Sequence, residues 1–96
     1  MKINFTKNAE ILNIALDGRL DTTTAPELES FLKENISGVS AIEINCENLS
    51  YVSSAGLRVL LSLHKRTLGA LTLTNVCDLV MEVFEITGFV DVLKIK

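Results

Sequence analysis

Residues 51–57 are Tyr-Val-Ser-Ser-Ala-Gly-Leu. Apolar residues at helical spacing begin at Leu57, so the segment is predicted to turn from a strand into a helix, with Ser53 or Ser54 as the N-cap. Serine alone is explained by capping, but Gly56 costs a helix about 1 kcal/mol relative to alanine. Close approach of another backbone, of a partner or of a nucleotide would explain this glycine, so a structural cap and a functional site both remain open.

Five short stretches alternate apolar and polar residues with the period of two that is typical of a strand. They lie at residues 3–6, 12–17, 42–46, 71–74 and 92–95. The third is expected to end near Cys46, so that residues 47–50 lead into the turn, and Gly18 is expected to end the second. Residues 7–10 are short enough for a hairpin, so the first two strands are predicted to be antiparallel.

The intervals after the second, third and fourth strands have helical periodicity. The apolar positions are residues 28, 31, 32 and 36, then 57, 60, 61, 64 and 68, and finally 80, 83 and 84 in a helix that begins near Asp78. The first helix is predicted to begin with a capping box, since Thr24 and Glu27 have the required spacing. The order of elements is therefore β-β-α-β-α-β-α-β.

These elements define a single α/β domain that spans residues 1–96. Strands that are joined through helices are parallel, with right-handed crossovers, so the sheet of four to five strands is predicted to be mixed and mostly parallel. Because alternate strand positions are polar, the helices are expected to pack mainly on one face of the sheet.

Charge and apolar runs limit the partners of the chain. A net charge of −3 argues against nucleic acid and against anionic membranes, since both require a basic surface. No apolar run approaches the roughly 20 residues of a membrane span, and no signal peptide is recognised, so a cytoplasmic protein without membrane insertion is predicted. Cys46 and Cys77 lack metal-ligand spacing and are expected to be reduced and buried.

Catalysis is not expected from this sequence. The single histidine, His64, shares a helix stripe with leucines and is interpreted as a boundary residue rather than as a base or a ligand. A hydrolytic serine needs a histidine and an acid beside it, and no Gly-x-Ser-x-Gly elbow, P-loop or dinucleotide glycine pattern is present. The sequence therefore predicts no catalytic residue, no metal and no cofactor.

Two motifs carry a resemblance to a known family. Residues 51–61, Tyr-Val-Ser-Ser-Ala-Gly-Leu-Arg-Val-Leu-Leu, resemble the signature segment of the STAS family, the bacterial anti-sigma factor antagonists. Residues 18–28 match that family's second motif, Gly-x-Leu-Asp-x-x-x-Ala-x-x-Leu, and residues 83–89 are similar in style to its C-terminal segment. The resemblance covers essentially the whole chain and implies the same order of elements.

This resemblance implies a partner switch. Such proteins bind, when unphosphorylated, to an anti-sigma factor that is often a serine kinase, and so release the sigma factor; a PPM-type phosphatase reverses the phosphorylation. The phosphoserine follows an aspartate in the family's commonest motif, Asp-Ser-Ser/Thr-Gly-Leu. Aligned through Gly56 and Leu57, that serine is Ser54, while Ser53 replaces the aspartate and is the second candidate. Ala55 replaces the second hydroxyl residue.

The resemblance also implies a docking surface around the turn. Asp21 is expected near Ser54 at the same end of the sheet, and Arg58 either contacts the partner or is solvated. The predicted partner-binding residues are Asp21, Thr22, Ser53, Ser54, Ala55, Gly56, Leu57 and Arg58. Two other functions stay open, namely a non-phosphorylated scaffold subunit of a transport or other regulatory assembly and a small nucleotide- or ligand-binding module that uses the same turn.

Overall fold

The computed structural model describes residues 1–96. Its elements are β1 (Lys2–Asn8), β2 (Ile11–Leu20), α1 (Ala25–Asn35), β3 (Ala41–Val52), α2 (Ser54–Arg66), β4 (Leu71–Thr74), α3 (Asp78–Thr87), the short 3-10 helix η1 (Phe89–Asp91) and β5 (Lys94–Ile95). The predicted order of strands and helices is confirmed. No helix is long and apolar enough to cross a membrane.

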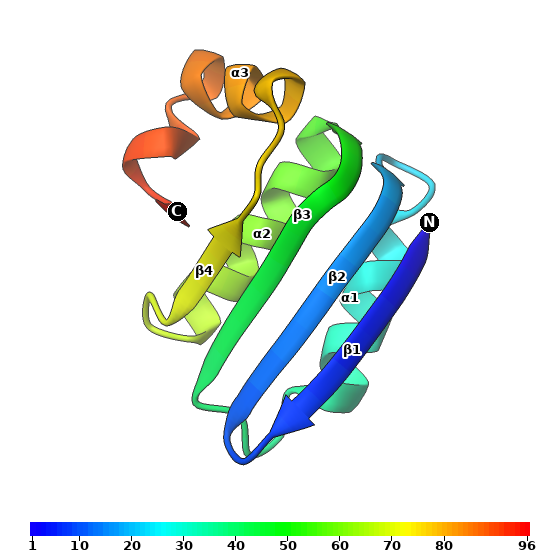
Figure 1. Ribbon diagram of the computed structural model, residues 1–96, viewed down its shortest axis with the longest axis vertical. Coiled ribbons are helices and arrows are strands. Elements are labelled where there is room, and N and C mark those ends of the chain that lie inside the picture. Colours follow the sequence, from blue (N-terminus) through cyan, green and yellow to red (C-terminus); the bar gives the residue numbers. More distant parts are fainter.

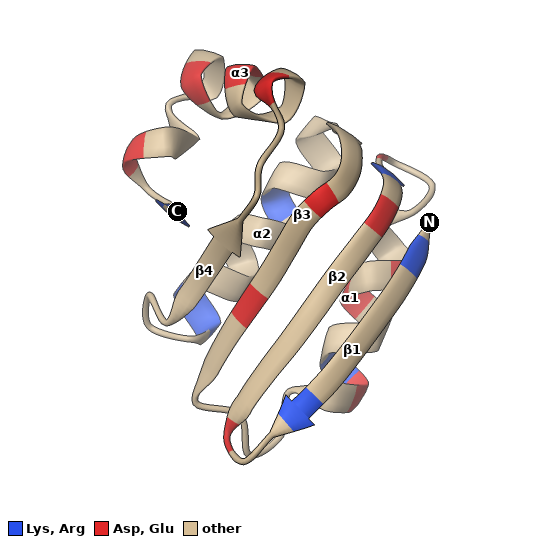
Figure 2. Ribbon diagram, viewed as in Figure 1, with Lys and Arg blue, Asp and Glu red and all other residues tan.

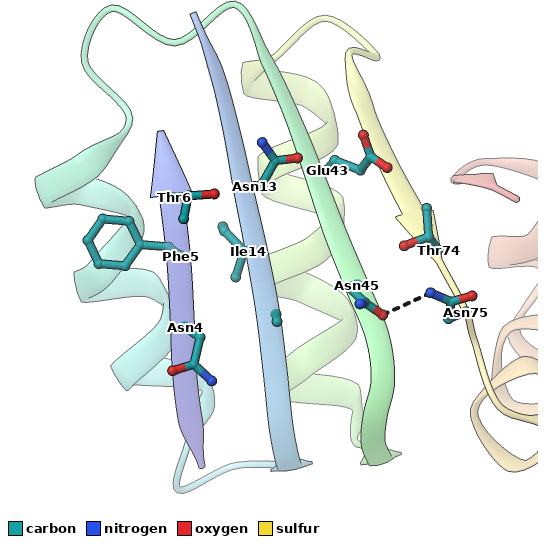
Figure 3. Close-up of a pocket in the computed structure, with 10 residues that line it drawn as sticks. Asn4, Phe5, Thr6, Asn13, Ile14, Glu43, Asn45, Thr74 and Asn75 are labelled. Atoms are coloured by element: carbon teal, nitrogen blue, oxygen red, sulfur yellow. Dashed lines mark hydrogen bonds between the residues drawn. The ribbon is translucent and has the colours of Figure 1, made fainter. Parts of the chain in front are cut away.

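The five strands form one sheet in the order β1-β2-β3-β4-β5, with β1 antiparallel to β2 and all other neighbours parallel. The mixed, mostly parallel sheet is therefore confirmed. Helices α1 and α2 cover one face of the sheet, and α3 lies beyond the carboxyl end of β3 (Figure 1). The opposite face is not covered by a helix and carries polar side chains around a shallow hollow (Figure 3), including Asn4, Thr6, Asn13, Glu43, Asn45 and Thr74.

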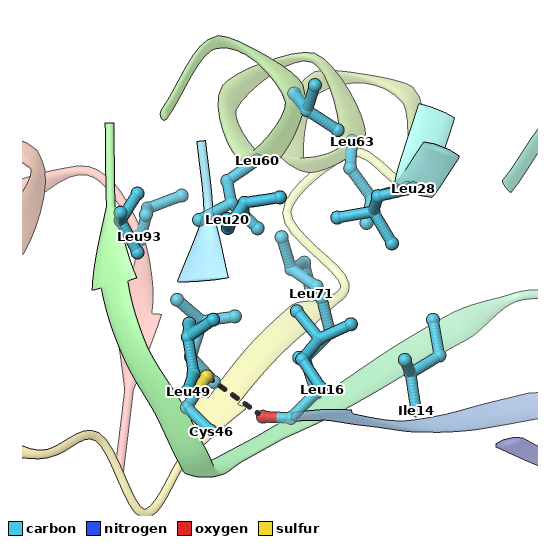
Figure 4. Packing of buried hydrophobic residues seen from close by; sticks show 14 of the residues in the cluster. Ile14, Leu16, Leu20, Leu28, Cys46, Leu49, Leu60, Leu63, Leu71 and Leu93 are labelled. Carbon is cyan, nitrogen blue, oxygen red and sulfur yellow. Dashed lines mark hydrogen bonds between the residues drawn. The ribbon is translucent and has the colours of Figure 1, made fainter. Parts of the chain in front are cut away.

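The core lies between the sheet and the helices and contains 21 buried apolar residues. Figure 4 shows side chains from α1, α2 and the strands meeting there, among them Leu28, Leu60, Leu63, Leu16, Leu20, Leu49 and Leu71. No polar or charged residue belongs to the buried set. The interior is therefore a packing core, and any polar chemistry of this chain takes place at its surface.

The two strands that lead to the turn are longer than the alternation pattern predicted. Strand β3 continues past Cys46 to Val52, because Asn48 and Leu49 and then Tyr51 and Val52 pair with β2, while Glu47 and Ser50 fall at register shifts. Strand β2 likewise passes through Gly18 rather than ending there; this glycine has a φ of +114° and precedes one of two register shifts against β3. Such irregularities interrupt the period of two, which is why the pattern missed the ends of both strands.

Leu68 is wrongly placed by the helical pattern. Helix α2 ends at Arg66, and Leu68 follows it in the left-handed region with a φ of 55° and 94% exposure. Leu63, which is 1% exposed, lies in the core instead.

Both cysteines are free thiols. Cys46 is buried as predicted, and burial raises the pKa of its thiol to about 12. Cys77, which precedes α3 and packs at the edge of the core, is only half-buried.

Candidate functional site

The carboxyl ends of β2 and β3 bring the two motif segments together. Leu20 pairs with Val52 in the parallel ladder, and the backbone N–H of Ser53 donates to the carbonyl of Leu20 at 2.9 Å. Asp21 and Ser54, which follow these strands, therefore leave the sheet at the same edge. Parallel strands make such an edge a common place for functional groups, because their connecting segments converge there.

Ser53 is the N-cap of α2. Its backbone is extended, with φ −92° and ψ 175°, and its hydroxyl accepts a hydrogen bond from the backbone N–H of Gly56 at 3.4 Å. Of the two capping serines that the sequence left open, the structure thus selects Ser53. Aspartate is an equally good N-cap, so the exchange of the family's aspartate for serine at this position retains the cap.

Ser54 is the first residue of α2 and is exposed. Its hydroxyl makes no hydrogen bond to another residue of the chain, in contrast to that of Ser53. The N–H groups of a first helical turn lack partners within the helix and stabilise negative charge nearby. A hydroxyl at this position is therefore accessible and lies in surroundings that tolerate an added anion.

Gly56 owes its presence to the close approach of β2. A Cβ atom at this position would lie 2.7 Å from Cγ and 2.9 Å from the carbonyl oxygen of Leu20. The approach of another backbone, one of the three explanations left by the sequence, thus accounts for the glycine without a ligand. Gly56 and Leu57 are both buried, so they shape the turn but offer no side chain to a partner.

Asp21 stabilises the turn that precedes α1. Its Oδ1 atom accepts hydrogen bonds from the backbone N–H groups of Thr23 at 3.0 Å and Thr24 at 3.1 Å, and Oδ2 lies 3.7 Å from Nε of Arg19. These contacts hold the pKa of the Asp21 carboxyl below its usual value of 3.8, with the Thr24 N–H contributing most.

The predicted capping box at the start of α1 is wrong. Thr24 adopts a helical conformation and its side chain caps nothing. Its hydroxyl instead donates to the carbonyl of Arg19 at 2.6 Å and accepts from the N–H of Asp21 at 2.8 Å. The carboxylate of Asp21 accepts the free N–H groups of this turn. Glu27 is therefore not needed as an acceptor for the N–H group at the N-cap position.

A groove lies between α1 and α2, and Ala55, the neighbour of the exposed serine, is part of its lining. It encloses about 380 Å³ and is lined by Thr22, Ala25, Pro26, Glu29, Ala55, Arg58, Val59 and Ser62. Arg58 is exposed and forms no ion pair, since the one ion pair of the chain joins Arg19 and Asp21. The sequence did not predict the groove residues that α1 contributes, namely Ala25, Pro26 and Glu29. Only the packing of α1 against α2 brings them beside Ala55.

The site contains no group that could activate Ser54. No histidine or carboxylate is hydrogen-bonded to its hydroxyl, and His64 is half-buried near the other end of α2. No cluster of His, Cys, Asp or Glu side chains could hold a metal ion. A reaction at Ser54 would therefore need a base that another molecule supplies.

We expect the contribution of Asp21 to stability to depend on pH. Its pKa is lower in the folded chain than in the unfolded chain, so its stabilising effect is complete above about pH 4 and is lost as the pH falls through the folded value. In urea unfolding, wild type should exceed Asp21→Asn in stability at neutral pH, and the difference should shrink below about pH 4. A difference that is the same at every pH would contradict this role of the carboxylate.

The fold and the site define a small α/β domain that presents the start of a helix at the carboxyl edge of a mixed sheet. The family model of the STAS domain matches residues 2–96. The chain therefore belongs to the STAS domain family.

Relatives and solved structures agree with this assignment. The anti-sigma-B factor antagonist of Staphylococcus aureus (strain NCTC 8325 / PS 47) is 32% identical to this chain over 104 aligned positions. The alignment covers 100% of this chain and 93% of that protein. The anti-sigma factor antagonist SpoIIAA in its unphosphorylated form has a TM-score of 0.83 at 22% identity, covering 99% of this chain and 88% of that one. The Bacillus cell fate determinant SpoIIAA in the phosphorylated form has a TM-score of 0.75 at 22% identity, covering 99% and 91%. Both structures share the fold of this chain.

Proposed function

We propose that this protein is an anti-sigma factor antagonist. In this proposal it acts in the cytoplasm, has no catalytic activity of its own, and releases a sigma factor by binding the anti-sigma factor. The full-length similarity to a protein named anti-sigma-B factor antagonist supports this function. The absence of an activating group beside the exposed serine also favours a binding role over catalysis.

The proposal includes a switch at Ser54. An anti-sigma factor with serine kinase activity phosphorylates this residue, and a PPM-type phosphatase removes the phosphate. The observation that carries this assignment is the difference between the two serines: Ser53 is committed to capping α2, whereas the hydroxyl of Ser54 is exposed and makes no hydrogen bond. SpoIIAA, which shares this fold, has been solved in a phosphorylated form. That structure supports the proposal that a phosphate leaves the domain folded.

The phosphate acts on docking rather than on folding. Its charge of about −1.5 to −2 sits beside the first turn of α2, where helix N–H groups stabilise it. At the docking surface the same charge adds to that of Asp21 and has to be desolvated when a partner covers it. Partner binding is thereby weakened, while Thr22, Ala55 and Arg58 remain available at the groove.

Mass spectrometry tests the modification. Incubation with the anti-sigma factor kinase of the same organism and Mg-ATP should add about 80 Da at Ser54. Ser54→Ala should remain unmodified, whereas Ser53→Ala should still be modified. Absence of phosphate with every such kinase would contradict the switch and favour the scaffold function; phosphate on Ser53 alone would assign the switch to the other serine.

Binding measurements test the consequence. Ser54→Asp should bind the anti-sigma factor at least tenfold more weakly than wild type, equivalent to about 1.4 kcal/mol. Ser54→Ala should bind as tightly as wild type, since no hydrogen bond is lost. Equal binding by the aspartate variant would contradict the repulsion mechanism, and loss of binding by both variants would show that the hydroxyl itself is a contact.

A further inference from the structure

Helix α3 and the segment that follows it expose an unusual amount of apolar surface. Leu79 is 56% exposed and Ile86 is 78% exposed, and with the half-buried Val83 they are spaced at i, i+4 and i+7 on one side of the helix. Val90 and Val92, 37% and 45% exposed, follow directly. Four of the seven large exposed apolar residues of the chain thus lie within this one segment. Such clustering marks an interaction surface.

This apolar surface has an acidic border. Residues 78–92 contain Asp78, Glu82, Glu85 and Asp91 and no lysine or arginine, and Figure 2 shows the acids on α3. The negative charge of these acids disfavours binding to an anionic membrane or to a nucleic acid. A suitable occupant would present an apolar side chain flanked by cations. We refer to Leu79, Val83 and Ile86 with these acids as the acidic surface.

The turn after α2 has the complementary properties. Leu68 is the most exposed large apolar residue of the chain, at 94%, and it has a φ of 55°. A bulky side chain is uncommon in this left-handed region, which asparagine or glycine occupies more readily. Lys65 and Arg66 beside it are exposed and form no ion pair. We refer to Lys65, Arg66 and Leu68 as the basic turn.

The two surfaces lie at opposite ends of the molecule. The turn between α2 and β4 is at the amino end of β4, whereas α3 lies beyond the carboxyl end of the sheet (Figure 1). They cannot meet within one chain, but they can meet between two chains. We propose that the acidic surface of one copy receives the basic turn of a second copy, with Leu68 against Leu79 and Ile86 and the cations facing Glu82 and Glu85.

The contact uses a different patch on each molecule, so it is heterologous and repeats head to tail into open chains or rings. One leucine and two charge pairs make a small interface, and small interfaces are weak and dependent on concentration. The exposed serine at the start of α2 is not part of the contact.

Sedimentation velocity at low salt tests this association. The average mass of the wild type should rise above 10.5 kDa as the concentration increases, and added salt should reduce the rise. Reversing the acids with Glu82→Lys and Glu85→Lys, or the cations with Lys65→Glu and Arg66→Glu, should leave each variant monomeric. An equimolar mixture of these two variants should associate again, because each surface then finds an opposite charge on the other variant.

Two further variants separate the contact from folding and from net charge. Leu68→Asn should abolish association while the melting temperature stays equal or rises, because asparagine accepts the left-handed conformation. Lys2→Glu with Lys33→Glu removes two cations elsewhere and should associate as wild type does. A wild type that remains at 10.5 kDa up to about 1 mM, a mixture that stays monomeric, or an associating Leu68→Asn variant would overturn the proposal.

Discussion

Gly56→Ala is expected to lower the free energy of unfolding by about 2 kcal/mol, in spite of the better helix propensity of alanine. The added Cβ would lie 2.7 Å from Cγ and 2.9 Å from the carbonyl oxygen of Leu20. The oxygen cannot give way easily, because it accepts the N–H of Ser53 in the bond that joins the two segments of the site. The start of α2 must therefore shift away from β2.

The sign of the change in the free energy of unfolding shows whether position 56 is as close to Leu20 as the structure indicates. If this close contact were absent, alanine in the helix would raise stability by about 1 kcal/mol. Ser62→Ala, at an exposed position of the same helix, is the matched control and should be neutral or slightly stabilising. Urea unfolding of both variants provides the measurement, and a more stable Gly56→Ala variant would refute the explanation given for this glycine.

Phe84→Ala is expected to lower the free energy of unfolding by about 4 kcal/mol. Phe84 has 0% exposure and heads the largest fully buried side chains. It attaches α3 to the rest of the core together with Val80, which is also 0% exposed. Since domains of this size have a total stability of roughly 5–15 kcal/mol, the melting temperature should fall by roughly 20 °C.

Ile86→Ala on the same helix is the control for this substitution. Ile86 is 78% exposed, so its truncation should change stability by less than about 0.5 kcal/mol. Thermal and urea unfolding of both variants should therefore differ strongly. A larger loss at Ile86 than at Phe84 would mean that α3 packs through its other side, and similar losses would contradict the role given to Phe84.

Local patterns predicted most of the fold, because they depend on residues that are near one another in the chain. Alternation located the strands, and helical spacing located α1, α2 and α3, with α3 beginning at Asp78 as expected. The pattern failed where a strand is irregular, as at Gly18, and where a helix ends early, as before Leu68. The irregularity of the strand and the early end of the helix both depend on contacts with other segments of the folded chain. A local pattern of apolar and polar residues carries no information about those contacts.

The same division applies to the candidate site. Alignment through the signature motif singled out Ser54, but spacing alone could not decide which serine caps the helix. The capping role of Ser53 depends on the direction of its hydroxyl in the folded turn. Likewise, the carboxylate of Asp21 replaces the predicted capping box, because it accepts the Thr24 N–H that the Glu27 side chain was expected to bind.

By itself the sequence determined the class of fold, the order of its elements and the presence of a hydroxyl at the start of the second helix. These are consequences of periodicity and of capping chemistry, both of which act over a few residues. Only the tertiary structure decided that Ser53 is the cap, that Leu20 makes Gly56 necessary, and that the acidic surface and the basic turn lie at opposite ends of the molecule. The first depends on the direction of a hydroxyl in the folded turn, and the other two depend on segments that are far apart in the chain and take their positions only when the core is packed.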